Sequence, residues 1–199
     1  MKTVSLAIVL FVLLSSQTFA ISPANVDLIS EAQAYGETHA QVVWTDFAAQ
    51  WGAFEEQAGR LDDSAEYAYL YTPFLLIASD AKEKTLIKQN LTKVDTEKLL
   101  ADYNGFLVFS VKLFGSTKDF AQGCNAQIKQ GKTIISSYQN TIPPEAADTI
   151  WKPKEPLYVT QCYFYFLEKD IDITKPISLE ILKSDKLGSS FYFDLPRIK

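Results

Sequence analysis

The sequence predicts an α+β fold, in which N-terminal helices and one strand pack on an antiparallel, sandwich-like C-terminal half. Apolar residues recur at three- and four-residue spacing before residue 104 and at two-residue spacing after it. The strand-like segments after residue 105 are separated by turn signals and by no helical pattern. The longest of them, residues 156–170, is apolar on both faces, which is typical of a central strand covered by protein on each side.

The first twenty residues have the form of a secretory signal peptide. Lys2 precedes the apolar run 4–14, and small residues close the segment at Ala20. The run is shorter than the about 20 residues of a membrane span, although an uncleaved anchor is the alternative. We therefore expect residues 1–20 to be removed. Residues 21–199 are expected to form a single domain that is secreted, periplasmic or at the cell surface, without membrane insertion.

The helical part is expected over about residues 23–104. A helix-capping residue and a first-turn proline mark the start of the first helix, and Thr72 and Pro73 mark the start of the third. Asn104 and Gly105, which favour the left-handed backbone conformation, mark the end of the last helix. Gly52 is a weak point in the second helix, because glycine disfavours helix interiors. The expected helices are 23–36, 44–58, one that starts at 73, and about 95–103, with a strand at 65–72 whose tyrosines alternate with smaller apolar residues.

The β part is expected over about residues 105–199. Its predicted strands are 106–114, 124–129, 133–138, 156–170, 177–181 and 191–195. Their intervals resemble those of immunoglobulin-like modules, which gives the sandwich-like (Ig-like) expectation, although the buried Trp typical of those modules is absent between the cysteines. The helices should cover one face of this sheet system, because each has only a narrow apolar stripe.

Cys124 and Cys162 are the only cysteines. Each lies on the apolar face of a predicted strand, so we expect them on facing or adjacent strands and joined by a disulfide, which would stabilise the fold by about 3–4 kcal/mol. Two buried free thiols are the alternative. Together with His39, the only histidine, they form no recognisable metal-ligand set, so no metal is expected.

The net charge and the absence of known catalytic and cofactor-binding motifs argue against several classes of function. The chain has 24 acidic and 19 basic residues and a formal net charge of −5, which argues against a nucleic-acid-binding protein. No phosphate-binding glycine loop, G-x-S-x-G or H-E-x-x-H occurs, and no cofactor is expected. His39 is interpreted as an exposed or helix-terminal residue. Asp170 and Asp172 lack the further ligands of a calcium loop and indicate a turn. Asn90 begins a glycosylation sequon, whose use depends on the source.

The acidic residues near the middle of the chain leave an enzymatic alternative open. A small secreted hydrolase needs a carboxylate pair at a fixed separation. The candidates by count are Glu55, Glu56, Asp62, Asp63 and Glu66, and solvated residues beside a turn explain them more simply. A cleft that gathers two carboxylates beneath an aromatic wall would support the hydrolase, and the absence of such a cleft would end it.

The segment Thr141–Pro156 is the one long irregular stretch. Its four prolines exclude a continuous central strand, and Trp151 stands among polar residues. Trp is enriched at interface hot spots, and the flanking Lys152 and Lys154 add weak steering. We therefore predict a binding surface at Trp151, Lys152 and Lys154, with Trp151 as a lid on the fold as the alternative. The expected function is that of an exported, soluble, non-enzymatic protein that binds a protein or glycan.

Overall fold

The computed structural model describes residues 25–149, 157–183 and 186–199. The expected signal peptide lies outside these residues. The helices are α1 (Val26–Thr38), α2 (Trp44–Phe47), α3 (Pro73–Leu86) and α4 (Lys93–Tyr103), with short 3₁₀ turns η1 (Ala49–Trp51), η2 (Glu168–Asp170) and η3 (Leu195–Arg197). None of the helices in the described ranges has the length and apolar character of a membrane span.

The described strands form two antiparallel sheets. The first has the order β1 (Gly52–Phe54), β2 (Tyr67–Tyr71), β3 (Phe106–Gly115), β8 (Leu157–Leu167) and β6 (Gln139–Thr141), with β7 (Ala147–Thr149) also paired to β8. The second has the order β10 (Lys186–Phe193), β9 (Ile177–Lys183), β4 (Asn125–Gln130) and β5 (Thr133–Ser136). The mixed α+β class with antiparallel sheets is confirmed, whereas the immunoglobulin-like arrangement is not.

The two sheets pack on each other through alternate side chains of their strands. Phe109 of β3 and Phe193 of β10 meet with ring centroids 5.2 Å apart, and both are buried. The same apolar cluster continues to Leu28 of α1 and Phe74 of α3. Helices and sheets therefore share one hydrophobic core, as the narrow apolar stripes of the helices require.

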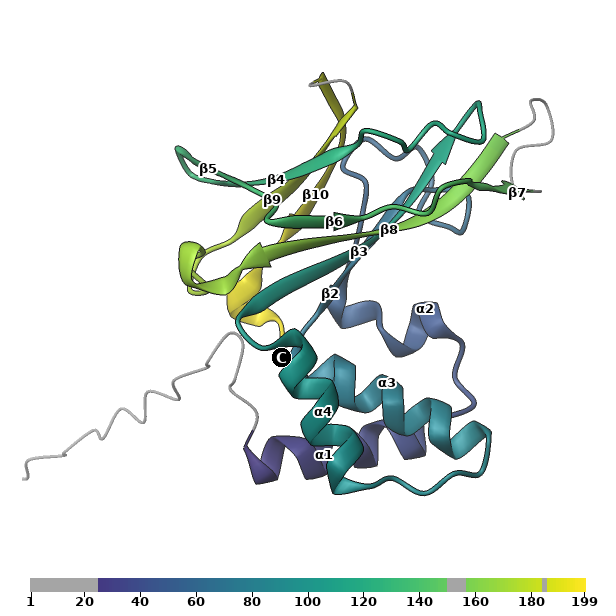
Figure 1. Cartoon of the computed structure of the whole chain (residues 1–199), viewed down its shortest axis with the longest axis vertical. Coiled ribbons are helices and arrows are strands. Elements are labelled where there is room, and N and C mark those ends of the chain that lie inside the picture. Colours follow the sequence, from purple (N-terminus) through teal and green to yellow (C-terminus); the bar gives the residue numbers. More distant parts are fainter. Residues whose placement is uncertain (1–24, 150–156, 184–185) are drawn as a thin grey trace, which may run out of the picture.

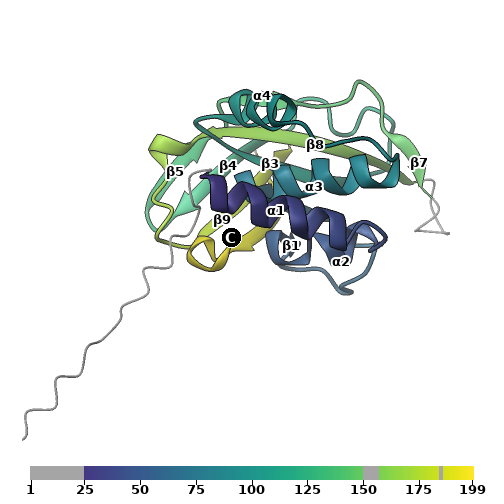
Figure 2. The same ribbon diagram turned by 90° about the horizontal axis from the view of Figure 1, so that it is seen from below.

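Strand β8 is central in its sheet but only one of its faces is fully covered. Cys162, Phe164 and Phe166 are buried on the face toward the second sheet. Gln161 and Tyr163, on the opposite face, are only half-buried. The prediction of protein on both sides is thus right for one face and incomplete for the other. The helices gather on one side of the sheets (Figures 1 and 2) and leave part of this outer face open.

The helix predicted over residues 44–58 is wrong. Helical structure ends at Trp51, and Gly52 begins the edge strand β1. A Cβ at Gly52 would lie 2.1 Å from the Tyr67 hydroxyl, so the glycine leaves room for the Tyr67 ring in its present position. Trp51 is buried, and its indole N–H donates to the Lys199 carbonyl over 2.6 Å. Its tertiary partners, and not helical periodicity, fix its position.

The third helix is as predicted. Thr72 caps α3 by accepting from the Leu75 N–H at 3.3 Å, and Pro73 occupies the first turn. Helix α1 crosses α3 so closely that a Cβ at Gly36 would lie 2.2 Å from the Ala78 carbonyl oxygen.

The prediction of an irregular 141–156 segment is wrong at its start, because β7 and the last residue of β6 pair with β8.

Candidate functional site

The outer face of the first sheet forms the floor of a cavity of about 720 Å³, which we call the aromatic cavity. Its walls come from α2 and from the loop before β2. Its lining residues are Trp44, Thr45, Asp46, Ala49, Phe54, Leu61, Asp62, Asp63, Tyr67, Tyr69, Tyr71, Ser110, Lys112, Gln161 and Tyr163. Aromatic side chains with a few polar groups in a concave site are the usual composition of a ligand-binding cavity.

Strand register brings these residues together. Because side chains alternate along a strand, residues opposite one another across the ladder share a face. One row across the sheet consists of Phe54, Tyr67, Lys112 and Gln161. The neighbouring row consists of Tyr69, Ser110 and Tyr163. Each row therefore places aromatic rings beside groups that form hydrogen bonds.

The rings contact one another in a continuous series. Phe54 meets Tyr67 edge-on at 4.5 Å between centroids, and Tyr67 lies 4.6 Å from Tyr69. Trp44 of α2 then contacts Tyr69 at 5.7 Å and stacks near Tyr71 at 6.5 Å. Edge-to-face and offset contacts of this kind stabilise aromatic pairs. The ring positions are consequently held by packing before any ligand arrives.

Polar groups on the floor are partly desolvated. The Lys112 ammonium donates to the Asp63 carbonyl at 2.9 Å. Burial lowers its pKa, and the nearby charges of Asp63 and Asp62 oppose that shift. Burial likewise raises the pKa of Tyr69, and it raises that of Tyr71 to about 12 with a smaller contribution from Tyr163. Both hydroxyls are protonated at neutral pH and can donate hydrogen bonds.

Two of the carboxylates predicted as hydrolase candidates do lie at this cavity. Asp62 accepts from the Ser64 N–H at 2.9 Å and from its hydroxyl at 2.5 Å. These hydrogen bonds lower its pKa, so Asp62 is ionised at neutral pH. A general acid for glycoside hydrolysis needs the opposite shift. Asp63 is exposed beside it, and Asp46 adds a third carboxylate to the lining.

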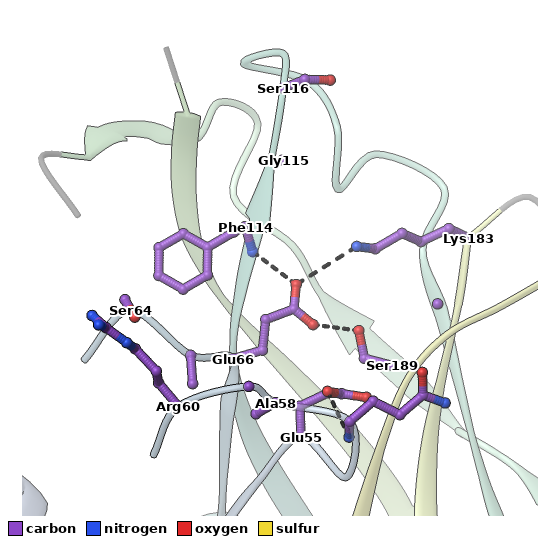
Figure 3. Close-up of a pocket in the computed structure, with 14 residues that line it drawn as sticks. Glu55, Ala58, Arg60, Ser64, Glu66, Phe114, Gly115, Ser116, Lys183 and Ser189 are labelled. Atoms are coloured by element: carbon purple, nitrogen blue, oxygen red, sulfur yellow. Dashed lines mark hydrogen bonds and ion pairs between the residues drawn. The ribbon is translucent and has the colours of Figure 1, made fainter. Parts of the chain in front are cut away.

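Of the other hydrolase candidates, Glu55 and Glu66, but not Glu56, line a second cavity of about 680 Å³ where the two sheets meet (Figure 3). We call it the seam cavity. Glu66 points to its centre, accepts from the Phe114 N–H at 3.0 Å and from the Ser189 hydroxyl, and lies 3.7 Å from the Lys183 ammonium. Both of its carboxylate oxygens are therefore engaged in joining the sheets.

Glu55 and Glu56 also connect the sheets. Glu55 forms a β-bridge with Phe191 of β10, and its carboxylate accepts from the Gln57 N–H at 2.8 Å. Glu56 donates its N–H to the Ser190 carbonyl at 2.8 Å, and its carboxylate accepts from the Ser190 hydroxyl. These contacts give Glu55, Glu56 and Glu66 structural roles at the junction of the two sheets.

Cys124 and Cys162 are free, buried thiols in the structure, so the expected disulfide is not present in it. Burial raises the pKa of both thiols, that of Cys162 to about 12. The charge of Cys124 is the next contribution at Cys162, which indicates that the two lie near each other. Thiols with raised pKa values are poor nucleophiles at neutral pH, and these belong to the core.

Other predicted candidates have structural surroundings. His39 follows α1 and stacks on Tyr35 with ring centroids 4.2 Å apart, which confirms the helix-terminal interpretation. Asp172 accepts from Thr174 and pairs with Lys175 at 2.6 Å, and these turn contacts lower its pKa to about 2. Among the residues that the structure describes, no cluster of three or more His, Cys, Asp or Glu side chains is arranged to hold a metal.

Trp151, Lys152 and Lys154 lie outside the described residues, so their binding role stays a prediction.

The sequence alone did not predict the aromatic cavity. The alternation Tyr67, Tyr69 and Tyr71 predicts a strand, and its further signal is that all three side chains end in a hydroxyl. A search of protein-family models, of curated proteins and of solved structures finds no match for this chain.

Proposed function

We propose that this protein is an exported, non-enzymatic glycan-binding protein that takes a sugar chain in the aromatic cavity. The observation that supports it is the alternation of rings and hydrogen-bonding groups on one sheet floor. A sugar ring has apolar C–H faces and a polar hydroxyl rim. The rings of Trp44, Tyr67 and Tyr163 offer surfaces for the faces, and Lys112, Gln161 and Asp63 offer partners for the rim.

A protein partner is the other ligand class that the sequence predicts. Specific protein interfaces bury about 800 Å² on each partner, with a fully buried apolar centre. The aromatic cavity is concave, and charged and amide groups lie on its floor beside the rings. That composition favours a small ligand rich in hydroxyl groups over the flat surface of a folded protein.

Calorimetric titration with soluble oligosaccharides tests the proposal. We expect binding to at least one of the β-1,4-linked glucose, xylose or N-acetylglucosamine hexamers, accompanied by a change in tryptophan fluorescence, because Trp44 lines the cavity. Trp44→Ala and Tyr163→Ala should each weaken that binding about 10-fold or more, as for hot-spot residues.

Tyr192→Ala is the matched control, because Tyr192 is 53% exposed on β10, away from the aromatic cavity. It should bind like the wild type, and thermal melting should show that all variants are folded. Equal loss in the control variant, or no loss in the cavity variants, contradicts the assignment of the site. Failure of all three hexamers, together with capture of a defined protein ligand that depends on Trp44, favours the protein class.

Hydrolysis is the second candidate function, because Asp62 and Asp63 line the same cavity as the aromatic wall. Chromatography of the hexamers after prolonged incubation distinguishes the two candidates. We expect intact hexamers, since the lowered pKa of Asp62 removes it as a general acid. Cleavage that disappears in Asp63→Asn would instead make this protein a hydrolase.

Two sequence-based hypotheses belong to the proposal. The first is an immunoglobulin-like sandwich that carries the site, supported by two sheets that share a core.

The second hypothesis is a further contact of the ligand with Trp151, Lys152 and Lys154. Trp151→Ala should then weaken binding by about 2 kcal/mol or more and leave the melting midpoint within a few degrees. A large fall in that midpoint would identify Trp151 as a lid instead.

A further inference from the structure

A smaller cavity of about 370 Å³ shares two residues with the aromatic cavity. Trp44 and Tyr71 line both. On the far side of these rings the lining comes from α3, with Ser79, Lys82, Glu83 and Leu86. We call this the helix cavity. The near-parallel rings of Trp44 and Tyr71, with an interplanar angle of 24°, therefore belong to the walls of two adjacent cavities.

We infer that the ligand is a linear oligosaccharide that lies across both cavities and passes the Trp44–Tyr71 pair. This inference rests on the proposed glycan-binding function and adds the chain length and the second contact region. It assigns Ser79, Glu83 and Leu86 of α3 as residues that bind the extended part of the ligand.

A ligand that contacts the whole row of tyrosines on β2 must have several units. Alternate residues of a strand are about 6.6 Å apart, so Tyr67 and Tyr71 are separated by about 13 Å along β2. A single sugar ring cannot contact both of these side chains. A chain of sugars that follows β2 contacts successive tyrosines and reaches α3 beyond Tyr71.

The helix cavity repeats the chemistry of the aromatic cavity on a smaller scale. Leu86 is 46% exposed and supplies apolar surface beside Trp44 and Tyr71. The Ser79 hydroxyl donates to the Leu76 carbonyl at 2.9 Å, so its oxygen can accept from a ligand hydroxyl. Glu83 adds carboxylate oxygens as acceptors.

Lys82 forms a fixed wall of the helix cavity. Its ammonium donates to the carbonyls of His39 at 3.2 Å, Val42 at 2.6 Å and Ala40. An ammonium has three donors, and all three are used within the protein. Lys82 therefore shapes this cavity without offering a cation to a ligand.

The charged residues that line the two cavities favour some linear sugars over others. Carboxylates of Asp46, Asp62 and Asp63 line the aromatic cavity, and Glu83 lines the helix cavity. Among the residues that the structure describes, Lys112 is the one ammonium that lines the aromatic cavity, and its donor bond to Asp63 is internal. Like charges close together oppose binding. The path therefore fits a chain of uncharged sugars better than a chain of uronic acids.

A length series of the oligosaccharide that binds in the first titration, from dimer to hexamer, tests the inference. Affinity should rise at least 10-fold from dimer to hexamer. Leu86→Ser should weaken the hexamer several-fold and leave the dimer unchanged. Ile87→Ser is the matched control, because Ile87 is the neighbouring residue, is 55% exposed and does not line the helix cavity. An acidic tetramer of galacturonic acid should bind at least 10-fold more weakly than the uncharged tetramer.

The outcomes separate this inference from the proposed function. Dimer and hexamer of equal affinity, or a hexamer insensitive to Leu86→Ser, would overturn the two-cavity path and leave glycan binding intact. If Leu86→Ser abolished binding of the disaccharide, the ligand would occupy a single subsite at α3. That result would also overturn the two-cavity path. Failure of all three hexamers to bind in the first titration would end both.

Discussion

The two faces of the first sheet are built from the same strands and have opposite chemistry. The inner face carries Leu70, Phe109 and Phe164, all fully buried against the second sheet. The outer face carries Tyr71 and Tyr163, which are half-buried. Both faces are rich in aromatic residues. On β2 and β8 the half-buried rings of the outer face carry a hydroxyl that the buried phenylalanines of the inner face lack, whereas Phe54 at the edge of the outer face has none.

This difference shows why aromatic content alone says little about function. A phenylalanine in the core contributes apolar area, and it has no polar atom that needs a partner. A tyrosine contributes similar area and keeps one end available for hydrogen bonds. The inner face therefore fixes the sheet, and the outer face is free to vary its contacts. Variants that compare the two faces directly can test this separation.

The largest expected difference is between Phe164→Ala and Tyr163→Ala, neighbours on β8 that point to opposite faces. Phe164 is 0% exposed, so truncation should cost about 3–5 kcal/mol of unfolding free energy. Tyr163 is half-buried, and its truncation should cost clearly less. Urea unfolding measures both. Equal losses would show that the outer face is as much part of the core as the inner face.

Glu66 is a charged residue on the inner side that joins the two sheets, and its removal should have the next largest effect. Glu66→Ala leaves the Phe114 N–H without this acceptor and the Lys183 ammonium without its carboxylate, which we expect to cost about 2 kcal/mol. Glu66→Gln keeps an acceptor oxygen and should lose less. Chemical denaturation of both variants provides the comparison, and a neutral Glu66→Ala would show that the seam cavity contributes nothing to joining the sheets.

Alkaline pH should weaken the protein through the outer face. Burial raises the pKa of folded Tyr71 to about 12, above the value of about 10 in an unfolded chain. Between these values the unfolded state loses its proton first, so stability falls as pH rises from about 10 to 12. Tyr71→Phe should reduce that fall by on the order of 1 kcal/mol. Thermal melts across this pH range measure it, and an identical pH dependence in the variant would assign the effect to other groups.

The smallest expected effect concerns the two buried thiols, Cys162 on the inner face of the first sheet and Cys124 just before β4 of the second. With Cys124 and Cys162 free, as in the structure, a reductant should leave the melting midpoint unchanged, and two thiols should react after unfolding. The disulfide expected from the sequence predicts no reactive thiol in the unreduced protein and a loss of about 3–4 kcal/mol on reduction. Thiol titration of the unfolded protein decides between the two.

Local signals predicted local structure well. Thr72 and Pro73 specify the start of α3, and the alternation of residues 106–114 specifies β3, because capping and strand period depend only on neighbours in sequence. The helix expected over 44–58 failed where a distant contact decides. Gly52 lies opposite Tyr69 in the pairing of β1 with β2, with the Tyr67 ring against it, and no periodicity of residues 44–58 indicates that pairing.

The candidate site was beyond reach of the sequence for the same reason. Each row of the aromatic cavity crosses strands, so Tyr67 meets Lys112 and Lys112 meets Gln161 only once the register is known. Glu66 was recognised as an acid, whereas its partner Ser189 lies 123 positions away. Trp151 was predicted to bind because it is a lone aromatic residue among polar residues in the sequence. The aromatic residues that do converge, such as Tyr69, each have an ordinary role in a strand when taken alone.

From the contact of Trp51 with the Lys199 main-chain oxygen we expect a particular order of events in folding. It joins residues 148 positions apart, and Thr72, which caps α3, donates its hydroxyl to the same oxygen across 127 positions. Contacts of such long range form slowly, because a large loop must close first. The helices on this side can form early from local signals, but the junction of η1 with α3 is completed only when the segment around Lys199 docks. Burial of Trp51 is then a marker of the final stage of folding.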